Sequence, residues 1–357
     1  MKKQLTSFAI SALFLSAGIF FTGCSKEEDK TNGDLTFNAG ALVTNEGQFQ
    51  KGNGGVSFIS QQNNEVTRDV FMTVNNRPLG DVVQSLTEHD GKIYVVVNNS
   101  EKIEIADART FKEAGVINGL QLPRYAVASE DKLYVTEWVN YGLSGRVAVI
   151  DLDSNTVSKT ITVGQLPEKV LLLNKKLYVL NNGENTISVI NTTTDAVETT
   201  IPVGDSPNGI VTTSDGIWVL CGGKKVYGGA PDYALDPNLS TAGSLVKINP
   251  ATGAVTRTIT FNSKTDMPTN LATNGNKMYY NAEGKLYQMA PSDTALAKTS
   301  LINRNFSGLG INPKSGNIFG AVSPSFSSNG KVICYNGLGV PLDSFTVGIG
   351  PNNIYFR

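Results

Sequence analysis

The chain has 357 residues, of which 40% are hydrophobic, 8% aromatic and 17% charged. Lysine and arginine (30) almost balance aspartate and glutamate (31), which argues against the basic surface of a nucleic-acid-binding protein. The single histidine, His89, excludes a multi-histidine metal site and argues against a histidine-based triad. The three cysteines form no CxxC pair, which excludes a zinc or iron–sulfur cluster.

Residues 1–23 have the pattern of a secretory signal peptide. Two lysines precede an apolar run that ends at Phe21. The sequence Phe-Thr-Gly-Cys at 21–24 resembles a bacterial lipobox, which implies cleavage before Cys24 and acylation of its thiol. An ordinary signal peptide followed by a chance cysteine is the alternative. No later stretch has 18 apolar residues, so we expect membrane attachment through the lipid alone.

A lipidated acidic linker is expected at residues 24–37. Its charged run, Lys-Glu-Glu-Asp-Lys at 26–30, resembles the export signal of Bacteroidota surface lipoproteins. That resemblance implies a lipid-anchored protein on the outer membrane that faces the cell exterior. A simple solvated linker explains the same residues.

Residues 38–357 repeat one pattern of short strands and polar turns. A Lys-Leu-Tyr-Val phrase or a close variant begins at Lys92, Lys132, Lys176, Gly216, Lys277 and Asn317. A proline opens most units, and Ser307 takes the equivalent place in one of them. These opening residues are Pro78, Pro123, Pro167, Pro207, Pro268, Ser307 and Pro351. Most spacings are close to the 40–45 residues that are typical of a four-stranded propeller blade.

The two ends of the chain complement each other. Residues 351–357 supply only a first strand, whereas 40–44, 55–60 and 66–71 supply the other three. Closing the ring in this way leaves no exposed radial edge strand. The sequence therefore predicts one all-β domain at 38–357. We expect a seven-bladed β-propeller with four antiparallel strands per blade.

Two sets of buried residues are expected in this ring. Cys221 and Cys334 belong to blades that are not neighbours, so we expect them to be unpaired core residues. An aromatic residue recurs at one register of the second strands, which is typical of packing between blades. These aromatic residues are Tyr94, Tyr134, Tyr178, Trp218, Tyr279 and Phe319.

One face of a propeller gathers the loops that lead into the first strands and those that join second to third strands. Its central mouth is the usual ligand site. On this face we expect amides, three cations and several aromatic side chains, which suit a large, neutral, polar ligand. For each asparagine, the alternative is a turn at a strand end. The candidate ligand-binding residues are Arg77, Asn98, Asn99, Arg124, Tyr125, Glu137, Trp138, Tyr141, Lys169, Asn181, Asn182, Asn208, Tyr227, Tyr233, Asn270, Phe306, Phe326 and Asn352.

With these repeats, residues 38–357 resemble the YncE-like seven-bladed propellers. Together with the lipobox and the acidic run, the chain resembles the Bacteroidota surface propeller lipoproteins. That resemblance implies tight binding of cobalamin or a related corrinoid on one propeller face, and its transfer to a TonB-dependent outer-membrane transporter. Cobalamin carries amide side chains and a phosphate that Arg77, Arg124 or Lys169 can meet. No fixed motif of the family assigns contact residues here.

Other functions fit the same fold. A glycan-binding lipoprotein would stack Trp138 and the tyrosines on sugar rings, and a surface-layer protein would self-associate. Propeller lactonases and quinoproteins share the architecture, but they need a metal, a histidine or a redox cofactor. The acids expected near the ligand face, Glu46, Glu137 and Glu168, come from different blades. We therefore expect no catalytic residues, no cofactor and no metal.

Overall fold

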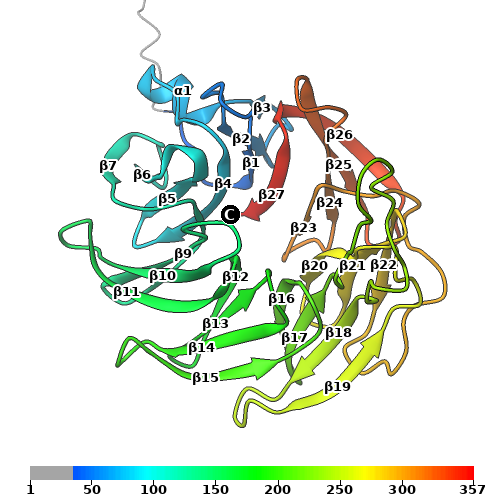
Figure 1. The fold of residues 1–357 in the computed structure, drawn as a ribbon. Helices are drawn as coiled ribbons and strands as arrows, with labels where there is room; N and C mark the ends of the chain where they lie inside the picture. The colour runs from blue at the N-terminus through cyan, green and yellow to red at the C-terminus, as the bar shows by residue number, and fades with distance from the viewer. Residues whose placement is uncertain (1–34) are drawn as a thin grey trace, which may run out of the picture. The chain divides into compact units, whose positions relative to one another are not determined.

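The computed structural model describes residues 35–357, and residues 36–357 form one compact unit. The predicted signal peptide at 1–23, the predicted lipid attachment at Cys24 and most of the linker at 24–37 lie outside the described residues. Within the described part, no helix is long and apolar enough to cross a membrane. Seven antiparallel sheets follow one another around a ring (Figure 1), which confirms the all-β, seven-bladed propeller.

We number the blades from the one that contains both ends of the propeller. Blade 1 consists of β27 (Pro351–Phe356), β1 (Gly40–Asn45), β2 (Gly55–Ser60) and β3 (Val66–Thr67). Blade 2 consists of β4 (Val83–His89), β5 (Lys92–Val97), β6 (Lys102–Asp107) and β7 (Glu113–Ile117). Blade 3 consists of β8 (Pro123–Ser129), β9 (Lys132–Glu137), β10 (Ser144–Asp151) and β11 (Thr156–Gln165).

The other four blades continue around the ring. Blade 4 consists of β12 (Pro167–Leu173), β13 (Lys176–Asn181), β14 (Thr186–Asn191) and β15 (Ala196–Pro202). Blade 5 consists of β16 (Pro207–Thr213), β17 (Gly216–Cys221), β18 (Ser244–Ile248) and β19 (Val255–Thr260). Blade 6 consists of β20 (Thr269–Thr273), β21 (Met278–Ala282) and β22 (Lys285–Met289). Blade 7 consists of β23 (Gly308–Ile311), β24 (Ile318–Val322), β25 (Asn329–Tyr335) and β26 (Pro341–Ile349).

The second strands are buried along nearly their whole length, because each packs against a neighbouring blade on both faces. Outer strands such as β15 are mostly exposed and polar. Cys221 and Cys334 are buried and unpaired, as predicted. The recurring aromatic residues are also buried core residues, as predicted, and they are Tyr94, Tyr134, Tyr178, Trp218, Tyr279 and Phe319.

Pairing of β27 with β1 closes the ring, as the sequence predicts. The register places Ala41 opposite Phe356 and Val43 opposite Ile354. The last residue, Arg357, fixes this joint further, since its guanidinium donates a 2.7 Å hydrogen bond to the carbonyl of Phe37. It also forms a 3.0 Å ion pair with Glu88 of blade 2. The two ends of the propeller are therefore tied to each other and to the next blade.

Two blades depart from the repeat. The predicted strand at 66–71 ends at Thr67, because Asp69 caps a short helix, α1 (Val70–Asn75), by accepting a hydrogen bond from the Met72 amide. In blade 6, residues 290–306 take the place of a fourth strand but pair with β22 only at Leu286. Pro291 has no amide hydrogen for a ladder, and a turn at 290–293 bends the chain away.

We expect the substitution Ile354→Ala to lower the free energy of unfolding by about 2–5 kcal/mol, because it leaves a cavity in the joint between β27 and β1. Ile354 is 8% exposed and packs in the core shared by blades 1 and 7. The matched control is Leu342→Ala on β26, whose side chain is 56% exposed and whose loss should have little effect. Urea unfolding monitored by circular dichroism measures both variants. Equal stability of the two would contradict a structural role for the joint.

Candidate functional site

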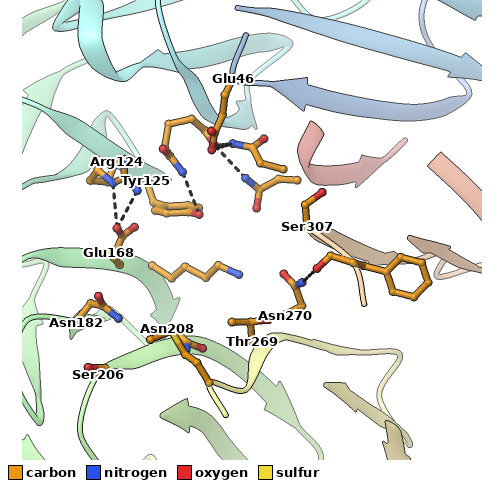
Figure 2. Close-up of a pocket in the computed structure, with 16 residues that line it drawn as sticks. Glu46, Arg124, Tyr125, Glu168, Asn182, Ser206, Asn208, Thr269, Asn270 and Ser307 are labelled. Atoms are coloured by element: carbon orange, nitrogen blue, oxygen red, sulfur yellow. Dashed lines mark hydrogen bonds and ion pairs between the residues drawn. The ribbon is translucent and has the colours of Figure 1, made fainter. Parts of the chain in front are cut away.

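A cavity of about 460 Å³ lies where the first strands of the blades begin, at the centre of one face (Figure 2). All seven blades, with the segments that lead into them, contribute to its wall. The lining is mainly amides, hydroxyls and four charged side chains. The lining residues are Glu46, Gln84, Arg124, Tyr125, Glu168, Lys169, Asn182, Ser206, Asn208, Met267, Thr269, Asn270, Phe306, Ser307, Asn352 and Asn353.

The lining side chains are placed by a bulge that six blades share. At the start of the first strand, the register to the second strand shifts in blades 1 to 6. A bulge leaves residues outside the regular ladder and re-aims their side chains. In blade 7 no such shift occurs, and Phe306 and Ser307 line the cavity instead. The bulged residues in the cavity wall are Gln84, Arg124, Tyr125, Glu168, Lys169, Asn208, Asn270 and Asn352.

The backbone just before these bulges has an unusual conformation. Val82, Leu122, Leu166 and Ser206 all have positive φ, between 46° and 59°. This left-handed region is uncommon for residues other than glycine and is most unfavourable for a β-branched side chain such as that of Val82. Such strain persists only where the surrounding structure holds it. The first strands therefore begin in a fixed geometry around the cavity.

Arg124 and Glu168 form a partly buried ion pair in the wall. Figure 2 shows the two side chains facing each other. The distance between Arg124 Nη2 and Glu168 Oε1 is 2.9 Å. Burial raises the pKa of Glu168, and the charge of Arg124 opposes that rise. The Arg124 guanidinium also stacks on the Trp138 ring, 4.0 Å from its centroid. Arg124 is thus already neutralised and held in place.

Lys169 is the cation of this wall that has no ion-pair partner among the described residues. Its ammonium nitrogen lies 6.0 Å from the centroid of the Tyr125 ring. Burial lowers the pKa of Lys169, although the charge of Glu168 opposes this effect. Burial also raises the pKa of Tyr125 to about 12, so its hydroxyl stays neutral. Because no carboxylate among the described residues forms an ion pair with it, the Lys169 ammonium can donate to a ligand.

The asparagines of the wall connect neighbouring blades. Asn182 donates to the carbonyl of Pro207, Asn208 to that of Pro268 (2.9 Å) and Asn270 to that of Phe306 (2.7 Å). Each bond uses the amide nitrogen and so fixes the direction of the amide oxygen. The oxygen of Asn208 is buried and has no hydrogen-bond partner among the described residues. A ligand with an N–H or O–H group can donate to it.

The opposite side of the cavity is held by blade 1. Asn352 donates to Glu46 Oε1 at 3.2 Å and to the carbonyl of Gln84 at 3.0 Å. Asn353 donates to the same carbonyl at 2.9 Å. The charges in the wall balance, since Glu46 and Glu168 match Arg124 and Lys169. A ligand without a large net charge suits such a wall.

Eight of the residues predicted from sequence line the cavity. They are Arg124, Tyr125, Lys169, Asn182, Asn208, Asn270, Phe306 and Asn352. Glu46 and Glu168, which were expected near this face but not among the ligand residues, also line the cavity. The sequence does contain a signal for Glu168. It directly follows the opening Pro167, just as Arg124 directly follows Pro123 in the preceding blade.

The placement of Arg77 at the start of a first strand is wrong. β4 begins at Val83, five residues after Pro78, so Gln84 rather than Arg77 takes the bulged position. Arg77 instead forms ion pairs of 2.9 Å with Glu104 and 2.7 Å with Glu113, in the outer strands of blade 2. It cannot contribute a charge to the cavity.

Several predicted polar residues do not line the cavity because they are engaged within the fold. Asn98 donates to the carbonyl of Pro123, and Asn99 bonds to Asp81. Asn181 is fully buried and bonds to two hydroxyls on β14. Glu137 is fully buried and pairs with Arg146. These contacts engage the side chains within the fold, so they are not offered to a ligand in the cavity.

The predicted aromatic residues in the loops that join second to third strands lie outside the cavity wall. Trp138 packs on Arg124 and, edge to face, on Tyr141 at 5.3 Å between centroids. The others are strongly exposed on loops that join second to third strands, on the same face as the cavity. They are Tyr141 (67% exposed), Tyr227 (62%), Tyr233 (67%) and Phe326 (81%).

Within residues 35–357, no group of three or more His, Cys, Asp and Glu side chains is placed to hold a metal ion. His89 lies on β4 next to the turn that joins it to β5, at the end of blade 2 away from the cavity. Its ring accepts or donates a 2.8 Å hydrogen bond with the carbonyl of Glu130. His89 therefore does not reach the cavity wall.

Comparison with solved structures supports the fold. A quinonprotein alcohol dehydrogenase-like protein from Bacteroides thetaiotaomicron is 15% identical, with a TM-score of 0.66 over 90% of this chain and 79% of the other. A functionally unknown protein from Desulfotomaculum acetoxidans is 11% identical, with a TM-score of 0.65 over 89% and 99%. BamB from Moraxella catarrhalis is 16% identical, with a TM-score of 0.50 over 87% and 84%. At these identities, the likeness concerns the fold alone.

Sequence comparison adds the family. No curated protein matches the chain significantly. Residues 39–333 match a family described as a domain of unknown function, DUF5074. The match covers most of the propeller and includes strands from every blade. The chain therefore belongs to the DUF5074 family.

Proposed function

We propose that this protein binds cobalamin or a related corrinoid at the central cavity, as a non-catalytic, lipid-anchored protein on the outer face of the outer membrane. It then passes the ligand to a TonB-dependent transporter. The observation that carries the proposal is the convergence of bulged amide and charged side chains from six blades on one cavity. The lipid anchor and the location rest on the lipobox at Cys24 and the acidic run that follows it.

The chemistry of the wall suits such a ligand. A corrinoid carries many amide side chains, which can donate to the free oxygen of Asn208 and accept from the ammonium of Lys169. The phosphate of cobalamin can pair with Lys169, the cation that lacks a carboxylate partner. A cavity of about 460 Å³ receives one side of so large a ligand, and the rest lies over the open face.

The same geometry favours binding over catalysis. The two acids of the wall are engaged, Glu168 by Arg124 and Glu46 by Asn352. A general acid or base needs a proton-exchanging group free to reach the substrate. The exposed aromatic residues around the cavity suit a docking surface for the transporter. They also keep a glycan as the alternative ligand, since sugar rings stack on exposed tyrosines.

Titration of the purified non-lipidated protein with cyanocobalamin should show one-to-one binding. The substitution Lys169→Met should weaken that binding about tenfold, because it removes a charged donor to the ligand. Lys159→Met on the outer strand β11 is the matched control and should leave the affinity unchanged. Isothermal titration calorimetry measures all three proteins. Absence of heat with cyanocobalamin, together with binding of an oligosaccharide, would favour the glycan alternative.

Affinity for cyanocobalamin should fall with rising pH before the ordinary lysine pKa of 10.5 is reached. Burial lowers the pKa of Lys169, so in the free protein its ammonium loses a proton at a lower pH than an ordinary lysine does. An anionic group of the ligand favours the protonated form of Lys169. Binding at alkaline pH should therefore take up a proton, which appears as a dependence of the binding heat on the buffer. In Lys169→Met the dependence should disappear, whereas Lys159→Met should keep it. A pH-dependence that survives in Lys169→Met would assign it to another group.

A further inference from the structure

Blade 6 contains a second pocket, separate from the central cavity. Its volume is about 310 Å³, and it shares no lining residue with the central cavity. It lies between the end of β19 in blade 5, strands β21 and β22, and the segment that follows β22. The lining residues are Phe261, Asn262, Tyr280, Ala282, Glu283, Tyr287, Leu296, Ala297 and Lys298.

The pocket occurs in the blade that has three ladder strands. After β22, the chain at 290–306 leaves the edge of the sheet and returns to pair with it only at Leu286 (Figure 1). Its residues 296–298 form one wall of the pocket, and Tyr287 of β22 forms another. A regular fourth strand would lie along β22 at this position. The departure from the repeat therefore produces the hollow.

The interior of the pocket is aromatic. The rings of Tyr280 and Tyr287 are nearly parallel, with 11° between their planes and 5.7 Å between their centroids. Phe261 meets Tyr280 edge to face, at 5.5 Å and 77°. Leu296 completes the apolar lining. Such walls favour a flat ring that stacks on tyrosine faces.

One polar group inside the pocket has an unmet hydrogen bond. Tyr280 is 1% exposed, and within the described residues no group accepts the proton of its hydroxyl. The backbone of Ala297 faces the hydroxyl oxygen, but an amide there is a donor and not an acceptor. Burial raises the pKa of Tyr280 to about 12, so the hydroxyl remains a donor at neutral pH. A buried donor without an acceptor destabilises a fold unless a ligand or water supplies one.

The mouth of the pocket differs from its interior. Asn262, Glu283 and Lys298 are exposed and polar, with one acidic and one basic side chain. These side chains keep the mouth of the pocket hydrated, and the charges of Glu283 and Lys298 cancel. A small uncharged ligand can therefore enter past them and stack inside.

We propose that this pocket binds a small planar aromatic molecule of one or two rings that carries a hydrogen-bond acceptor for the Tyr280 hydroxyl. The acceptor is a ring nitrogen or a carbonyl oxygen. The ring lies against Tyr287 and Leu296. This site is independent of the proposed corrinoid site, because the two share no residues.

The test uses quinoline, a two-ring probe with a ring nitrogen, and naphthalene, which has the same shape but no acceptor. Ligand-observed NMR titration of the non-lipidated protein should show quinoline binding about fivefold tighter than naphthalene. In Tyr280→Phe the preference should disappear, while naphthalene binding should remain. Leu296→Trp fills the pocket and should abolish binding of both probes. Lys169→Met in the central cavity should change neither.

A stability measurement separates a ligand-binding hydroxyl from a structural one. Since the hydroxyl has no acceptor, Tyr280→Phe should unfold at the same temperature as the parent protein or higher. A lower unfolding temperature would show that the hydroxyl supports the fold, and it would overturn the assignment. Equal binding of quinoline to the parent and to Leu296→Trp would overturn it as well. Loss of cyanocobalamin binding has no bearing on either outcome.

Discussion

The hydrogen-bonded ladder between β27 and β1 is the constraint on which the rest of the structure depends. It joins the last strand of the chain to the first, with Arg357 bonded to Phe37 and paired with Glu88. Seven strand starts can surround one centre only if the ring is closed. The cavity wall therefore depends on strand pairing between residues about 310 positions apart. Asn352 of β27 is itself part of the wall, where it bonds to Glu46.

The residues that give the cavity its chemistry also hold the blades together. Asn208 and Asn270 use their amide nitrogens to bond the next blade and leave their oxygens for other partners. Arg124 and Glu168 likewise join blade 3 to blade 4. Substitution of these residues changes both the ligand site and the ring, so a loss of binding would be ambiguous. Lys169 lacks such a bond between blades, which is why its substitution reports on the ligand most directly.

The fold could be predicted from sequence because its signals are local and repeated. The Lys-Leu-Tyr-Val phrases mark second strands, and Pro123, Pro167 and Pro207 mark the starts of first strands. The site was predictable where the same register held, as for Arg124, Lys169 and Asn208. The prediction was wrong at Arg77, because Pro78 lies five residues before the start of β4. Counting from this proline therefore does not lead to Gln84, which takes the bulged position. The pairing of Arg124 with Glu168 joins residues 44 positions apart, and no local pattern indicates it.

The position of the closing joint explains why blade 6 can vary. The ring is closed by strand pairing in blade 1, so the outer strands of the other blades have no part in closing it. Blade 6 can therefore lack a regular outer strand and still keep its first and second strands around the cavity. Blade 6 keeps Asn270 in the cavity wall while its outer edge opens beside Tyr287. The centre of the ring is thus constrained by all seven blades, whereas the periphery is free to change. A polar site at the centre and an aromatic pocket at the edge can therefore coexist in one domain without sharing residues.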